Sequence, residues 1–285
     1  MSTFIDPTVS ASTTITFRLA GGDNPLILVP VRVDDQGPYQ FILDTGASHC
    51  LLSRGLSDIL GVKPEMEKEA TGAAGPVTLA FAHVASMAVG SARQLNVPIA
   101  ITSELERVAV AIGTRVDGAL GFAFFKNLSL TIDYSARSLS LASPSNAADV
   151  SLSANSISFK LAAPHKPLIL LPVIVNGQGP FQFALDTGAS RTMLSSELAE
   201  KLAIEVADDS PVTAGGGQIK IFAANVASLV LGNARVFDHA VGVGEFLAML
   251  SQAIGARLDG IIGYNFLNQF QVTIDYPRRL LKLQP

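Results

Sequence analysis

The amino-acid sequence predicts an all-β protein formed by tandem duplication, with a few short helices. One observation is an internal repeat: residues 25–53 and 167–195 are identical at about two thirds of their positions, at a constant offset of 142 residues that carries Asp44 onto Asp186. The other is the pattern of residue types along the chain. β-branched and aromatic runs alternate with turn residues, and helical periodicity is scarce.

Composition excludes several classes of protein. The chain has 285 residues, with 20 Lys and Arg against 24 Asp and Glu, so no basic surplus is available for nucleic acid. Hydrophobic residues make up 48% of the chain, which excludes intrinsic disorder. The uncharged stretch 167–185 contains three prolines and two glycines, so we expect no membrane span. The N-terminus lacks signal-peptide features, and the compartment stays open: cytoplasmic, or periplasmic or secreted after removal of a leader.

The repeat predicts two modules, 1–145 and 146–285, joined by a segment rich in Ser, Ala and Asn. Two copies are too few for a solenoid, so we expect a pseudo-twofold dimer within a single chain, and hence a monomer. Equivalent residues of the two modules can then meet at the axis. One site would receive the same chemical group twice.

Strands are expected in matching places in both modules. Residues 27–33 and 39–43 are apolar runs separated by a turn cluster at 34–38. Alternating apolar residues predict strands at 15–19 and 157–161. Closing strands are expected at 128–132, 139–141 and 271–283.

The expected helices are short. Capping serines at Ser53 and Ser195 begin helical patterns over 53–60 and 195–202, and Gly61 ends the first of them. Single turns are expected at 122–127 and 264–268. The apolar segment 246–254 is interpreted as core or as support for a flap rather than as a membrane helix.

The sequence Asp-Thr-Gly-Ala-Ser occurs twice, each time directly after an apolar strand, and begins at Asp44 and Asp186. A single copy is compatible with a strand-ending turn, but two copies in a duplicated chain favour a shared site. Two aspartates brought together in a cleft of low dielectric cannot both ionise, so the pair holds one proton. Such a pair can activate water and protonate a carbonyl oxygen, which is general acid–base hydrolysis.

These residues resemble the retropepsin-like aspartic proteases, in the single-chain form with two modules. Beyond the two Asp-Thr-Gly-Ala-Ser motifs, each half carries a glycine-rich flap segment, 71–75 and 213–217. Each half also carries an apolar-apolar-glycine motif, at 119–121 and 261–263, which packs behind the catalytic loop in that family. The resemblance implies a pepsin-like, bilobal acid-protease barrel that binds an extended peptide and needs neither metal nor cofactor.

The resemblance also implies roles for named residues. Asp44 and Asp186 would be catalytic. Thr45 and Thr187 would lock the two loops together, and Gly46 and Gly188 would present backbone groups to substrate. The flap residues expected to contact substrate are Thr71, Gly72, Ala73, Thr213, Ala214 and Gly215.

Some features depart from the pepsin pattern. Ala47 and Ala189 follow the glycines where pepsin-type enzymes usually have Ser or Thr, so we expect a mildly acidic optimum. Pro76 is expected to stiffen the first flap and the triple glycine 215–217 to loosen the second. Asp117, Asp259 and the pair His49–Cys50 are interpreted as structural. The alternative function is a catalytically silent module that binds peptide or protein in the same cleft.

Overall fold

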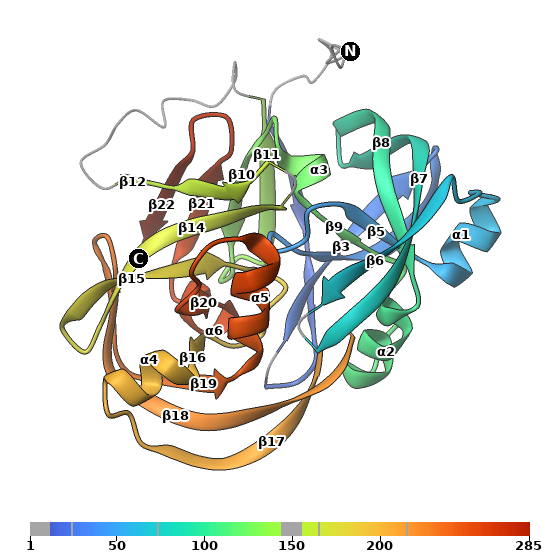
Figure 1. Cartoon of the computed structure of the whole chain (residues 1–285). Helices are drawn as coiled ribbons and strands as arrows, with labels where there is room; N and C mark the ends of the chain where they lie inside the picture. The colour runs from blue at the N-terminus through green and yellow to red at the C-terminus, as the bar shows by residue number, and fades with distance from the viewer. Residues whose placement is uncertain (1–11, 24, 73, 144–155, 165, 215) are drawn as a thin grey trace.

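The computed structural model of the chain describes residues 12–23, 25–72, 74–143, 156–164, 166–214 and 216–285. It is mainly β, with two similar mixed sheets and a third sheet that contains strands from both halves of the chain (Figure 1). The predicted fold class is therefore confirmed. The predicted boundary between residues 145 and 146 lies outside the described residues.

Each half builds an eight-stranded sheet whose strands follow the same order. In the first half the order is β2 (Arg18–Ala20), β3 (Leu26–Val33), β4 (Gln36–Leu43), β9 (Gly118–Leu120), β5 (Cys50–Ser53), β8 (Ala92–Thr102), β7 (Gly75–Val89), β6 (Met66–Gly72). In the second it is β13 (Lys160–Ala163), β14 (Lys166–Val175), β15 (Gln178–Leu185), β20 (Gly260–Ile262), β16 (Met193–Ser195), β19 (Ala234–Gly244), β18 (Gly217–Leu231), β17 (Val206–Ala214). Additional pairing of β3 with β7, and of β14 with β18, curls each sheet towards a barrel.

The third sheet joins the halves. Its order is β1 (Thr13–Thr16), β11 (Ser138–Ala142), β10 (Ser129–Asp133), β21 (Gln271–Asp275), β22 (Leu280–Gln284), β12 (Ser156–Ser158). At its centre β10 pairs antiparallel with β21, and Thr131 lies opposite its own repeat equivalent, Thr273, with the two hydroxyls 2.9 Å apart. The pseudo-twofold axis therefore passes between these two residues.

The strand predictions need three corrections. The predicted strands at 15–19 and 157–161 are each divided, because Phe17 and Phe159 turn into the core and their flanking strands join different sheets. The predicted closing strand 271–283 is a hairpin of two strands. The turn predicted over 34–38 is only Asp34–Asp35, whose positive φ angles suit a two-residue hairpin turn, and Gln36 already belongs to β4.

Four of the six helices were predicted: α1 (Arg54–Leu60), α3 (Phe122–Phe125), α4 (Ser196–Lys201) and α6 (Tyr264–Leu267). The hydroxyls of Ser53 and Ser195 cap α1 and α4 by accepting N–H groups of the first turn. The sequence prediction missed α2 (Glu104–Ala111) and did not recognise α5 (Phe246–Ile254) as a helix. No helix of the described residues is long and apolar enough to cross a membrane.

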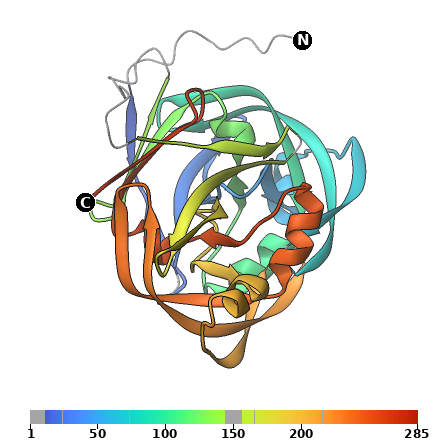
Figure 2. The same ribbon diagram turned by 60° about the vertical axis from the view of Figure 1, so that its left-hand side comes forward.

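Helices α2 and α5 occupy equivalent places. Leu105 and Leu247 anchor them in two small apolar clusters on the same face of each sheet. From there α2 lies beside β17 and α5 lies beside β6 (Figures 1 and 2). Each helix of one half thus contacts the outer strand of the other half's hairpin.

Candidate active site

Asp44 and Asp186 each follow the end of a buried strand, β4 or β15. The N–H of Asp44 donates to the carbonyl of Leu120, and the N–H of Asp186 donates to that of Ile262, both over 3.0 Å. These carbonyls belong to β9 and β20, the strands predicted to pack behind the loops. The repeat therefore places the two aspartates in identical backbone settings.

Gly121 and Gly263 end these supporting strands and lie directly against the loops. A Cβ atom on Gly121 would clash with the carbonyls of Ala47 and His49, and one on Gly263 would clash with the equivalent pair, Ala189 and Arg191. Only glycine allows this approach. The position of both apolar-apolar-glycine motifs is as predicted.

Backbone amides hold the two carboxylates. Asp44 Oδ1 accepts the N–H of Gly46 and of Ala47, each over 2.9 Å, and Asp186 Oδ1 accepts the N–H of Gly188 over 2.8 Å. The tight Asp-Thr-Gly turn thus directs its own amides at its own aspartate. Such donors stabilise the ionised form of a carboxyl group.

Each carboxylate also lies against the glycine of the opposite half. A Cβ on Gly46 would be 2.6 Å from Asp186 Cγ, and a Cβ on Gly188 would be 2.8 Å from Asp44 Cγ. A side chain at either glycine would force the opposing carboxylate to shift. The chain therefore brings the two aspartates together from positions 142 residues apart.

Burial and proximity together perturb both acids. Loss of hydration, followed by the charge of Asp186, raises the pKa of Asp44 to about 8 despite the opposing N–H donors. Loss of hydration also raises the pKa of Asp186, while its hydrogen bonds with Gly188 and with the Asp44 carboxyl oppose the increase. The two carboxyl groups titrate as a coupled pair that retains a proton well above the ordinary range of an aspartic acid.

Two threonines join the loops across the axis. The N–H of Thr45 donates to Thr187 Oγ1 and the N–H of Thr187 donates to Thr45 Oγ1, both over 3.0 Å. Each hydroxyl then donates to a carbonyl of the other half, Thr45 to Leu185 over 3.2 Å and Thr187 to Leu43 over 2.7 Å. Both side chains are buried. Each hydroxyl thus both accepts a hydrogen bond from the other half and donates one to it, which holds the two loops together.

The glycine-rich segments predicted as flaps are the tips of two hairpins, β6–β7 and β17–β18. Gly72 pairs with Gly75 in the first hairpin, and Ala214 pairs with Gly217 in the second. The two tips meet, since a Cβ on Gly216 would lie 2.7 Å from the carbonyl oxygen of Gly75. Ala73 and Gly215 lie outside the described residues.

Three contacts between the halves define one axis: Thr131 with Thr273, Thr45 with Thr187, and the tip of one hairpin with the tip of the other. Contacts between equivalent parts of a duplicated chain lie at its pseudo-twofold axis. The aspartate pair and the hairpin tips therefore share that axis.

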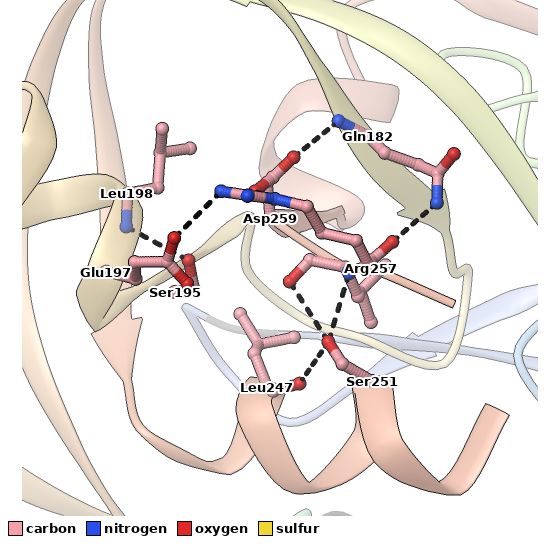
Figure 3. Close-up of polar contacts among 9 residues, drawn as sticks. Gln182, Ser195, Glu197, Leu198, Leu247, Ser251, Arg257 and Asp259 are labelled. Carbon is pink, nitrogen blue, oxygen red and sulfur yellow. Dashed lines mark hydrogen bonds and ion pairs between the residues drawn. The ribbon is translucent and has the colours of Figure 1, made fainter. Parts of the chain in front are cut away.

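Asp117 and Asp259, the other repeated aspartates, have structural roles. Asp259 accepts the N–H of Gln182 over 2.8 Å and pairs with Arg257 over 2.6 Å, and Arg257 also reaches Glu197 over 3.0 Å (Figure 3). Asp117 makes the same contacts with Gln40 and Arg115. Each aspartate thus fastens its neighbouring strand.

The surroundings of Cys50 and His49 fit structural roles. Cys50 is fully buried, and burial raises the pKa of its thiol to about 12, so it stays protonated. His49 hydrogen-bonds the Ser48 hydroxyl over 3.1 Å and packs edge-on against Phe81. The interpretation of this pair as structural agrees with its surroundings.

No cluster of three or more His, Cys, Asp or Glu that could bind a metal occurs among the described residues. Open cavities of about 510 and 420 Å³ border α2, and neither is lined by Asp44 or Asp186. The candidate site is thus the aspartate pair itself with the two hairpins.

Comparison with known proteins identifies the family. Residues 29–124 and 171–266 each match the family described as Aspartyl protease, and together these segments make up more than half of the chain. No curated protein matches the sequence. The two matched segments include the two aspartate loops, the two hairpins and the two glycine motifs described above. The chain belongs to the aspartyl protease family, in the form of two retropepsin-like copies in tandem.

Proposed function

We propose that the protein is an aspartic endopeptidase whose catalytic pair is Asp44 and Asp186, one contributed by each half. The observation that carries the proposal is the mutual packing of each carboxylate against the opposite Asp-Thr-Gly glycine. It is supported by the raised pKa of both acids, which lets the pair hold one proton at working pH. Residues 1–145 and 146–285 are then two half-sites, and neither is complete alone.

The reaction follows from the shared proton. The ionised carboxylate accepts a proton from a water molecule, which attacks the scissile carbonyl carbon. The protonated carboxyl donates its proton to the carbonyl oxygen, which gives a tetrahedral intermediate. The C–N bond of this intermediate then breaks as a proton is transferred to the leaving amine. Thr45 and Thr187 serve by fixing the separation of the two loops. Gly46 and Gly188 serve by leaving room for the opposing carboxylate, which refines the expected role of presenting backbone groups to substrate.

The substrate of this proposal is an extended peptide lying between the aspartate pair and the two hairpins. The backbone of a hairpin can bind such a peptide by main-chain hydrogen bonds, as an added β-strand. The residues assigned to this contact are Thr71, Gly72, Ala73, Thr213, Ala214 and Gly215. Opening and closing of the tips would admit the peptide and exclude bulk water.

Incubation with a diverse peptide mixture, followed by mass spectrometry, tests the proposal. We expect internal cleavage at discrete bonds and inhibition by a statine-type analogue, which mimics the tetrahedral state. Peptide binding without cleavage between pH 3 and 8 would contradict it and identify a silent binding module instead.

A further inference from the structure

A hydrogen bond joins helix α2 of the first half to the tip of the β17–β18 hairpin of the second half. Glu104 Oε2 accepts the N–H of Gly216 over 2.9 Å, across 112 residues of sequence. Gly216 has φ near +99°, and the adjacent Gly217 has φ near +138°. Backbone of this kind is open to glycine alone, so the tip exposes an N–H with no side chain in front of it.

Glu104 is held ready for this contact. Its own N–H donates to Thr102 Oγ1 over 3.2 Å, which fixes the first turn of α2. Its carboxylate also approaches Arg107 at 3.4 Å on the same helix. Only 18% of the Glu104 side chain is exposed, whereas the partner Arg107 is 59% exposed. A partly buried, ionised acceptor makes a stronger hydrogen bond than a neutral, solvated one.

The contact bears on both hairpins, because the two tips touch. Gly216 packs directly on the backbone of Gly75 at the first tip. Helix α5, which faces the first hairpin, has no equivalent acceptor, because the repeat carries Glu104 onto Phe246. The Phe246 ring packs beside Gly244 and Ile221 in the apolar cluster below α5. The two halves are thus asymmetric at this place, where the Glu104 carboxylate contacts the tip of the second hairpin.

We infer that Glu104 is a positioning residue that holds the second hairpin tip, and through it the first, in the closed position. Its consequence for catalysis rests on the proposed peptidase function. Peptide entry then requires this hydrogen bond to open, and closure over bound peptide re-forms it. Gly216 and Gly217 have no side chains of their own to fix the tip, and the hydrogen bond to Glu104 supplies that constraint.

Hydrogen exchange with mass spectrometry, on peptic fragments covering 216–219, tests the inference in the whole protein. We expect about tenfold faster exchange at the tip in Glu104→Ala and near wild-type exchange in Glu104→Gln, whose amide oxygen still accepts. Glu106→Ala removes the same charge from the same helix, but the Glu106 carboxylate accepts the N–H of Arg54 rather than that of Gly216, so this variant should leave exchange at the tip unchanged. Equal exchange in wild type and Glu104→Ala, at equal melting temperature, would overturn the inference.

Kinetics provide the second readout. We expect Glu104→Ala to lower kcat/KM about tenfold, mainly through KM, and to weaken binding of the statine-type analogue, with Glu104→Gln restoring most of both. Faster exchange at the tip with unchanged kcat/KM would overturn the positioning role. If wild type cleaves no peptide, the proposed function fails, and the exchange experiment still decides whether Glu104 holds the tip.

Discussion

Thr45 and Thr187 exchange hydrogen bonds across the two halves of the chain, each backbone N–H donating to the hydroxyl of the other over 3.0 Å. The same hydroxyls donate onward to Leu185 and Leu43, the residues that precede the two aspartates. The aspartate pair is therefore built on a closed set of bonds between the halves.

Replacing Thr187 by Val keeps the shape of the side chain and removes its hydroxyl. The N–H of Thr45 then loses its acceptor in a buried place, so we expect the free energy of unfolding to fall by about 1–3 kcal/mol. Urea unfolding measures this, together with a loss of activity as the loops shift. Thr187→Ser retains the hydroxyl and should lie close to wild type; equal losses in Ser and Val variants would show that the hydroxyl is not the cause.

Gly46→Ala tests the close approach of the two loops. The new Cβ would lie 2.6 Å from Asp186 Cγ, so the carboxylates must move apart. We expect kcat/KM to fall by about 100-fold or more, because a displacement of about 1 Å at reacting groups has that effect. Gly55→Ala, on α1 with no atom within 4 Å of the added methyl, is the matched control and should retain full activity.

The raised pKa values of the two acids predict the pH range of the proposed activity. The pKa of Asp44 is about 8 and that of Asp186 lies above the ordinary 3.8, so the singly protonated pair exists between these limits. We expect the profile of kcat/KM to peak between about pH 4 and 8 and to decline as pH rises through about 8. A maximum at or below pH 3 would contradict this assignment.

The same shift makes stability depend on pH. The pKa of Asp44 is higher in the folded state than in the unfolded state. The contribution of its protonation to the free energy of unfolding is therefore complete below about pH 4 and disappears as pH rises through about 8. Urea unfolding of wild type and Asp44→Asn across this range isolates the effect. The difference in unfolding free energy between the two proteins should change with pH, and a constant difference would contradict the raised pKa.

Asp259→Ala is expected to weaken the fold rather than the chemistry. It leaves Gln182 N–H and Arg257 without a buried acceptor, at a cost of about 2–4 kcal/mol in unfolding free energy. Glu197→Ala removes the exposed partner of the same arginine and should cost less than about 1 kcal/mol. Comparable losses in the two variants would remove the distinction between the buried and the exposed partner.

The sequence predicts most of the fold because the repeat doubles each local signal. The aspartate loops, their supporting glycines and the hairpins all occur twice with constant spacing, so an ambiguous pattern in one half is checked by the other. The local turn at Asp34–Asp35 was overestimated in length because Gly37 and Pro38, residues typical of turns, lie inside β4.

Helix α2 and Glu104 were missed for the opposite reason. The repeat carries Glu104 onto Phe246 and Ser103 onto Glu245, so the local signal is not repeated. An available signal was Ser103 before two acidic residues, Glu104 and Glu106, in the first turn of an apolar pattern. The bond from Glu104 to Gly216 joins distant segments, and no local pattern predicts it.

The most direct test of a single site shared by both halves is the activity of Asp44→Asn, Asp186→Asn and the double variant, each checked for folding by its melting temperature. We expect either single change to lower kcat/KM by about 1,000-fold or more and the second change to add little, since both residues act as one unit. A folded single variant that keeps more than about one tenth of wild-type activity would contradict it.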